Sequence, residues 1–125
     1  MLYIDIMSRT PVYEQIINQM ERLITAGLLK EGEQLPSVRA LSLELSVNPN
    51  TIQKAYGELD AKGIIGSVPG RGCYVMPGAC DILRNIARER LSEIKSLAKD
   101  LMAAGVTKEE IICAIDESCE KEETK

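Results

Sequence analysis

The chain contains no histidine, phenylalanine or tryptophan, and its only aromatic residues are four tyrosines. Without histidine it lacks the side chain that most often serves as a general base or a zinc ligand near neutral pH. No two of its cysteines form a Cys-x-x-Cys pair, so we expect no metal site. We interpret the cysteines as reduced, partly buried thiols, with a thiol sensor as the alternative. They are Cys73, Cys80, Cys113 and Cys119.

Catalytic and membrane signatures are lacking as well. The sequence has no phosphate-binding Gly-x-x-x-x-Gly-Lys motif and no nucleophile elbow, so we expect neither an enzyme nor a cofactor. No apolar run approaches the roughly 20 residues that a membrane-spanning helix needs. The segment 1–7 contains Asp5 and does not resemble a signal peptide. We therefore expect a cytoplasmic protein with no membrane partner.

Acidic residues outnumber basic ones, and the net charge is −4. Nucleic-acid binders usually carry a basic patch, so this balance counts against DNA as a partner. Residues 1–78 hold seven Lys/Arg and eight Asp/Glu (net −1), whereas residues 79–125 hold eight and eleven (net −3). Because most of the excess acid lies in the C-terminal part, a DNA-binding face would have to be basic locally.

Local signals predict three helices in the first half of the chain. Thr10-Pro11 is typical of an N-cap followed by proline at the first helical position, and Gly27 is typical of a helix end. Ser37 is placed to cap a second helix that reaches Leu45. Asn48-Pro49 repeats the cap signal for a third helix, which Gly63 ends.

A hairpin and a short break complete this pattern. Ser46-Val47 separates the second and third helices closely, as in a helix-turn-helix. A strand beginning at Ile64-Ile65, a turn over residues 68–72 and a return strand over 73–75 form a small wing. Residues 1–7 are either a short strand or an extended arm, and Gln34-Leu35 is a further short strand. The predicted fold is mainly α with a small β-hairpin wing, a winged helix-turn-helix.

The C-terminal part follows a Pro77-Gly78 break and is predicted to be helical. One long helix is expected over residues 81–102, and Thr107 to Glu110 form a capping box for a last helix. We divide the chain into a winged domain, 1–77, and a two-helix dimerisation region, 78–125. A broad apolar face on two helices needs a partner, and a second copy is favoured over folding back onto the winged domain. The predicted dimerisation residues are Leu83, Ile86, Leu91, Ile94, Leu97, Leu101, Ile111 and Ile115.

Polar side chains at the start of the third helix are suited to reading base edges. The predicted base-reading residues are Asn50, Thr51, Gln53 and Lys54. The alternative is a merely solvated face. The other predicted DNA-binding residues are Ser37 and Arg39 at the start of the second helix, Asn48 at the cap of the third, and Gly70, Arg71 and Gly72 at the wing tip. Ser37 and Arg39 are expected at a phosphate, and Arg71 at the sugar-phosphate backbone or a minor groove.

Residues 3–77 resemble the N-terminal winged helix-turn-helix domain of the GntR family of bacterial transcription regulators. The short helical remainder is similar to the YtrA-type subfamily, whose short tail serves dimerisation. The matching segments are Ile4-Asp5, Pro11-Val12-Tyr13-Glu14-Gln15-Ile16, Gly32-Glu33-Gln34-Leu35-Pro36-Ser37-Val38-Arg39, Val47-Asn48-Pro49-Asn50-Thr51, Tyr56-Gly57-Glu58-Leu59, Lys62-Gly63 and Gly70-Arg71-Gly72-Cys73-Tyr74-Val75.

The resemblance implies a homodimeric, sequence-specific regulator, most simply a repressor, that occludes a promoter by binding a palindromic operator. It implies control of nearby transporter genes, often of the ABC type, and allows an unidentified small-molecule effector. It places Arg39, Asn50, Thr51, Gln53, Gly70 and Arg71 at DNA. The tail is too short for the larger effector domains or the aminotransferase-like domain of other relatives. The alternative is a protein-interaction module, which the acidic charge supports.

The chain departs from many relatives at four positions. Ser42 and Ser46 replace the common Ala and Gly, and both changes are small enough to keep the fold. Pro49 and Gln53 stand where many relatives carry a basic residue. Fewer cations on this helix should lower nonspecific DNA affinity and place more weight on the wing.

Overall fold

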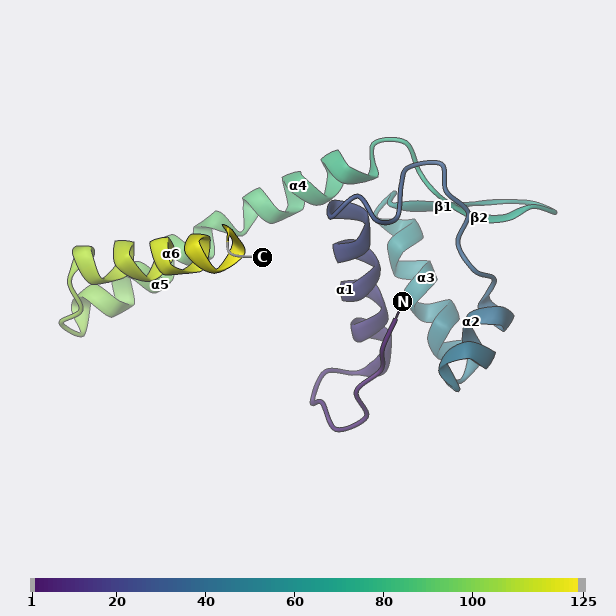
Figure 1. Cartoon of the computed structure of the whole chain (residues 1–125), viewed down its shortest axis with the longest axis horizontal. Helices are drawn as coiled ribbons and strands as arrows, with labels where there is room; N and C mark the ends of the chain where they lie inside the picture. The colour runs from purple at the N-terminus through teal and green to yellow at the C-terminus, as the bar shows by residue number, and fades with distance from the viewer. Residues whose placement is uncertain (1, 124–125) are drawn as a thin grey trace. The chain divides into compact units, whose positions relative to one another are not determined.

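In a computed structural model the chain forms six helices and one hairpin over the described residues (Figure 1). The structure describes residues 2–123, and the side chains of residues 2–119. These residues fall into two compact units, one ending at Ile86 and one beginning at Ala87. The first unit contains α1 (Val12–Thr25), α2 (Val38–Leu45), α3 (Pro49–Ala61), β1 (Ile65–Val68), β2 (Gly72–Val75) and the start of α4 (Ala79–Glu89).

The first helix begins one residue later than predicted. Pro11 occupies the N-cap position of α1, and no side chain caps the helix there, so the predicted Thr10 cap is wrong. The Thr10 carbonyl instead accepts a hydrogen bond from the Gln15 side chain at 2.8 Å. The predicted end is confirmed, since Gly27 has a positive φ of 79°.

The N-terminal segment forms an extended arm along α1. The Gln15 amide accepts from the backbone of Asp5 at 2.9 Å and donates back to it at 3.0 Å. Gln19 makes the same pair of bonds with the backbone of Tyr3. Two glutamine side chains therefore replace the backbone ladder that a neighbouring strand would supply, and the extended-arm alternative is confirmed.

The break between α2 and α3 depends on one residue in a left-handed conformation. Ser46 has φ 55°, the only positive φ at a non-glycine position among the described residues. The Val47 N–H donates to the Ser42 carbonyl, and the Ser42 hydroxyl donates to the Val47 carbonyl. These bonds close the turn, and α3 packs against α1, α2 and β1. The predicted helix-turn-helix is confirmed.

The wing is an antiparallel pair in which Ile65 faces Val75 and Val68 faces Gly72. The additional strand expected at residues 34–35 is reduced to a single bridge between Gln34 and Tyr74. A side chain at Gly66 would meet the Met76 sulfur at 2.6 Å, so the base of the wing leaves no room for a Cβ while Met76 keeps its position.

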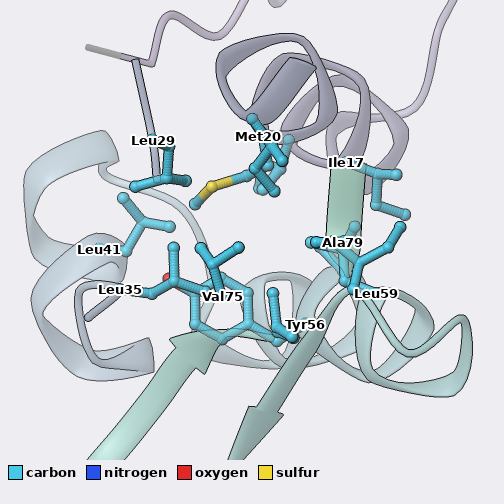
Figure 2. Packing of buried hydrophobic residues seen from close by; sticks show 14 of the residues in the cluster. Ile17, Met20, Leu29, Leu35, Leu41, Tyr56, Leu59, Val75 and Ala79 are labelled. Carbon is cyan, nitrogen blue, oxygen red and sulfur yellow. The ribbon is translucent and has the colours of Figure 1, made fainter. Parts of the chain in front are cut away.

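Apolar side chains from every element of the first unit form its core (Figure 2). Ile16, Ile52 and Leu59 are fully buried, as the helical spacing predicts. Ala79 and Leu83 extend this core into α4. Leu83 is only 7% exposed, so its predicted role in dimerisation is corrected: its side chain already packs within its own chain.

The second unit consists of the end of α4, α5 (Leu91–Ala103) and α6 (Lys108–Glu123). The single long helix predicted over residues 81–102 is wrong, because α4 ends at Glu89 and α5 begins after Arg90. The Ser92 hydroxyl donates to the Glu89 carbonyl at 3.1 Å and competes there with the helical N–H.

The last helix begins as predicted. The Thr107 N–H donates to the Glu110 carboxylate, and the Glu110 N–H donates to the Thr107 hydroxyl, each at 3.2 Å. This reciprocal pair is the expected capping box. Across the described residues, no helix has both the length and the apolar character that a bilayer crossing demands.

Candidate nucleic-acid interface

The start of α3 presents a polar face that is anchored from behind. The Asn48 side chain accepts from the Asn50 N–H at 2.8 Å, and Pro49 occupies the first turn. Asn50 and Gln53 are exposed, and Thr51 is half-buried. On the opposite face, α3 is buried through Ile52, Ala55, Tyr56 and Leu59.

The predicted Asn48 cap is confirmed, and it limits the DNA contact that was also predicted for this residue. Its side-chain oxygen is used by the cap, so only the amide N–H groups remain to donate to a phosphate. The helix start is consequently fixed before any ligand binds.

A buried tyrosine sets the position of α3 relative to the segment before α2. The Tyr56 hydroxyl donates to the Pro36 carbonyl at 2.7 Å. Burial raises the pKa of Tyr56 well above its ordinary range, with smaller contributions from Cys73 and Glu44. The hydroxyl thus remains a donor at physiological pH and links α3 to the segment before α2.

Lys54 is the only cation in α3, and it lies against α1. Its ammonium nitrogen is 3.9 Å from the centre of the Tyr13 ring, within the range of a cation–π interaction. The sequence prediction identified Lys54 but missed Tyr13, whose side chain comes from α1. No local pattern connects the two residues.

The start of α2 is capped as predicted and leaves an arginine exposed. The Ser37 hydroxyl accepts from the Ala40 N–H at 3.0 Å. Arg39 projects from the first turn into solvent. Backbone N–H groups at a helix start favour an anion, and Arg39 adds a full positive charge beside them.

The tip of the wing is held in one conformation by two side chains that sequence analysis did not select. The Arg71 carbonyl accepts from the Gln34 side chain at 2.7 Å and from the Tyr74 hydroxyl at 3.3 Å. Gly70 and Gly72 have φ values of 79° and 103°, which favour glycine. These contacts fix the backbone at the tip, while the Arg71 side chain stays exposed.

Exposed cations lie at the start of α2 (Arg39), on α3 (Lys54) and at the tip of the wing (Arg71). Lys62 pairs with Glu21 at 2.9 Å and is already engaged. Across the part of the chain that the structure describes, neither Arg39 nor Arg71 has an ion-pair partner within 4.0 Å. The guanidinium groups of Arg39 and Arg71 are therefore free to bind an external anion.

The cysteines remain free thiols. Cys73 and Cys80 are half-buried, as predicted, but Cys113 and Cys119 are exposed, so the burial prediction is wrong for these two. Among the described side chains, those of residues 2–119, no group of three or more cysteines or carboxylates is placed to hold a metal ion.

Residues 12–75 match the model of bacterial regulatory proteins of the gntR family. The chain belongs to the gntR family. The match begins at α1 and ends with β2, so it covers all three helices and the wing.

Similarity to one repressor continues through the tail. The chain is 44% identical to the transcriptional repressor YtrA of Bacillus subtilis over 112 residues, which are 89% of this chain and 86% of that protein. This confirms the YtrA-type resemblance. The related regulator YhcF of the same organism is 33% identical over 84% of this chain and 87% of its own length.

Solved structures agree with the fold. A transcriptional regulator from Oenococcus oeni has a TM-score of 0.75 at 28% identity, over 93% of this chain and 97% of that one. The AraR DNA-binding domain, solved in complex with operator ORX1, has a TM-score of 0.53 at 29% identity. That match covers 59% of this chain and 92% of the AraR domain. The winged-helix fold is thereby confirmed.

Proposed function

We propose that this GntR-family regulator is a homodimeric repressor that reads a palindromic operator through α3. The observation that carries the proposal is the exposed polar start of α3, fixed by the Asn48 cap and the buried stripe behind it. The second helix of a helix-turn-helix enters the major groove with its first residues at the base edges. The YtrA relative is a repressor, which favours the same sign of regulation.

Each exposed group has a matching role at DNA. Asn50 and Gln53 can pair with adenine, the Thr51 methyl can contact thymine, and Lys54 can donate to guanine. Ser37, Arg39 and the Asn48 amide lie at helix starts, where they would contact phosphates. Arg71, between Gly70 and Gly72 at the wing tip, would reach the backbone or a minor groove.

The dimer would form through the second unit. No residue of α5 is buried in the described chain, although the helix is amphipathic. Leu91, Ile94 and Leu97 are 56%, 50% and 58% exposed, and Ile115 on α6 is 47% exposed. A two-helix hairpin cannot cover such faces itself, whereas two copies can form a four-helix arrangement.

An apolar groove runs between α5 and α6 and gives this second copy a place to dock. Its volume is about 300 Å³, and Glu110 and Ser118 are the polar residues in its lining. The apolar lining includes Ile94, Leu97, Leu101, Ile111 and Ile115. All five are among the predicted dimerisation residues.

Repression would follow from occlusion, because a dimer bound across a promoter excludes polymerase. A palindromic site is expected, since two-fold symmetry in the protein is mirrored in the DNA it reads. An effector, if the chain has one, would act by changing the separation of the two α3 helices. The relatives that establish the family are transcription regulators, and we propose no catalytic activity.

Selection of bound sites from random duplex DNA tests this proposal. The expected outcome is an inverted repeat whose affinity falls steeply with salt, because phosphate contacts release counterions. Enrichment of no sequence, or recovery of single unpaired sites, would contradict the reading of a palindrome by a dimer.

The acidic net charge favours one other function, a protein-interaction module that uses the winged domain. That module would bind its partner with little salt dependence and would bind no duplex. Titrations at several salt concentrations therefore separate the two functions.

A further inference from the structure

The start of α4 lacks a cap of its own. The residue before the helix is Gly78, which has no side chain, and it adopts φ 86°. Asp81, the acid in the first turn, pairs with Arg84 at 3.3 Å. The first N–H groups of α4 therefore need an acceptor from elsewhere in the chain.

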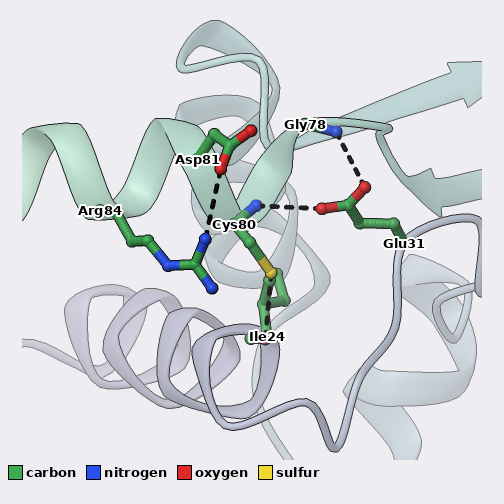
Figure 3. A network of polar contacts seen from close by, with 6 residues as sticks. All are labelled: Ile24, Glu31, Gly78, Cys80, Asp81 and Arg84. Carbon is green, nitrogen blue, oxygen red and sulfur yellow. Dashed lines mark hydrogen bonds and ion pairs between the residues drawn. The ribbon is translucent and has the colours of Figure 1, made fainter.

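Glu31, in the loop between α1 and α2, supplies that acceptor (Figure 3). One carboxylate oxygen accepts from the Gly78 N–H at 3.0 Å, and the other accepts from the Cys80 N–H at 3.4 Å. The intervening Ala79 N–H donates to the Met76 carbonyl at 3.1 Å. A carboxylate at this position also interacts favourably with the dipole of the helix.

The loop that carries Glu31 is itself fixed to the strand that leads into α4. The Gly32 N–H donates to the Val75 carbonyl at 2.7 Å, and the Val75 N–H donates to the Glu33 carbonyl at 3.0 Å. Glu31 thus joins two segments that are already paired through their backbones. The Glu31 backbone therefore has little freedom to move with α4 if the helix tilts.

Two more contacts tie the same helix start to the winged domain. The Cys80 thiol donates to the Ile24 carbonyl near the end of α1 at 3.5 Å. Ala79 is fully buried and Leu83 is 7% exposed, so apolar packing adds to the polar cap. Together these contacts hold the start of α4 against the rest of the first unit.

We propose that Glu31 is a positioning residue that, by capping α4 from another loop, sets the spacing at which two winged domains can read operator half-sites. This rests on the proposed function, a dimer held through the tail. Helix α4 begins in the first unit and ends in the second. Simultaneous binding of both half-sites requires the separation of the α3 helices to match the DNA repeat.

The Glu31→Ala variant of the full chain tests the proposal on operators whose half-sites are moved apart one base pair at a time. The wild type should bind its best spacing at least about tenfold more tightly than neighbouring spacings, because a mismatched dimer engages one half-site only. In Glu31→Ala the ratio of affinities between the best spacing and its neighbours should fall by a factor of about three or more. Affinity for DNA carrying a single half-site should not change.

Glu33→Ala is the matched control. It removes the same charge from the same loop, but the Glu33 carboxylate accepts from the Lys30 N–H and does not contact α4. The control should keep the wild-type preference for spacing.

Amide hydrogen exchange at Gly78 and Cys80 should accelerate in Glu31→Ala only. If that variant does not fold, Glu31→Gln, which keeps one acceptor oxygen, should show a smaller change of the same sign.

Two results would overturn the role of Glu31. One is an unchanged spacing preference in a folded Glu31→Ala chain. The other is a loss of affinity for single half-sites as large as the loss for the full operator, which would show damage to the winged domain itself. A wild-type chain that enriches no sequence would instead overturn the proposed function itself, so the two failures can be told apart.

Discussion

The ammonium group of Lys54 lies 3.9 Å from the centre of the Tyr13 ring, so the only cation of α3 is held by a residue of α1. A lysine in this position loses part of its conformational freedom before DNA arrives. The contact therefore lowers the entropic cost of using Lys54 at the interface.

Replacing Tyr13 by leucine should weaken operator binding, because the ring that orients Lys54 is lost. An exposed cation–π contact contributes about 0.5–1 kcal/mol, so the expected loss is about two- to fivefold in Kd. Tyr13→Phe keeps the ring and should bind as the wild type does. Fluorescence anisotropy titrations measure both, and equal Kd values for Leu and Phe variants would contradict the role of the ring.

Arginine and glutamine substitutions should have different signatures at the interface. Arg39→Ala and Arg71→Ala should weaken binding to all sequences and lower the salt slope by about one unit each, as loss of a phosphate contact does. Gln53→Ala should cost about 1–3 kcal/mol on the operator and relax selectivity at one base pair. Unchanged Kd values in all three variants, measured over a salt series, would show that the site is elsewhere.

Ser46 carries the strain of the helix-turn-helix. An L-residue in the left-handed region costs about 1–2 kcal/mol, and glycine avoids most of that cost while losing some chain entropy. Ser46→Gly should therefore raise the free energy of unfolding by about 0.5–1 kcal/mol. Ser46→Val should lower it, since a branched side chain tolerates this conformation least. Urea denaturation compares the three chains; a less stable glycine variant would contradict the strain.

Leu97→Lys should convert the proposed dimer to a monomer. Leu97 is 58% exposed on α5 and lines the groove against α6. Losing one buried leucine per subunit costs about 1.5–3 kcal/mol each, which weakens dimerisation by about two to four orders of magnitude. Ser96→Lys places the same charge on a neighbouring exposed position and should remain dimeric. Sedimentation equilibrium measures the oligomeric state of both variants. A dimeric Leu97→Lys chain would show that the interface does not include this face of α5.

The Glu31 cap should make stability depend on pH. Hydrogen bonds from the Gly78 N–H, and then from the Cys80 N–H, lower the pKa of Glu31 below its ordinary value of 4.5. A carboxylate whose pKa is lowered by folding stabilises the folded state fully above its unfolded pKa, and this contribution is lost as pH falls through the folded value. The wild type should therefore exceed Glu31→Gln in stability at pH 7.

That difference should narrow once the pH drops below about 4.5 and vanish at still lower pH, as thermal denaturation over this range can show. Glu33→Gln provides the control for loss of one acidic charge in the same loop. A constant difference between wild type and Glu31→Gln across the whole range would mean that the cap does not depend on ionisation.

The helices and the hairpin of the winged domain have local signals and were predicted correctly from sequence, apart from the Thr10 cap. Ser37, Asn48 and Gly27 act through bonds or dihedral angles within a few residues of their own position, so a linear pattern contains them. The winged fold follows from these signals and from the hydrophobic spacing. The Thr107 capping box was also predicted correctly, because its two hydrogen bonds join residues only three positions apart.

Contacts between distant segments could not be predicted in this way. Glu31 and Gly78 are 47 residues apart, and Tyr13 meets Lys54 from a different helix. The break at Arg90 contains neither proline nor glycine, and a serine hydroxyl at position 92 is a weak signal. Leu83 was assigned to the tail because its apolar spacing is the same whether it faces a partner or its own core.

The burial of Ala79 and Leu83 has a practical consequence for chimeric regulators. The family match ends at Val75, yet the core beneath the wing is closed by α4, four and eight residues further on. A winged domain transplanted with its end at Val75 would lack Ala79 and Leu83, two buried members of its core. Grafts joined beyond Ile86 should carry a complete core, and they would bring the capped start of α4 with them.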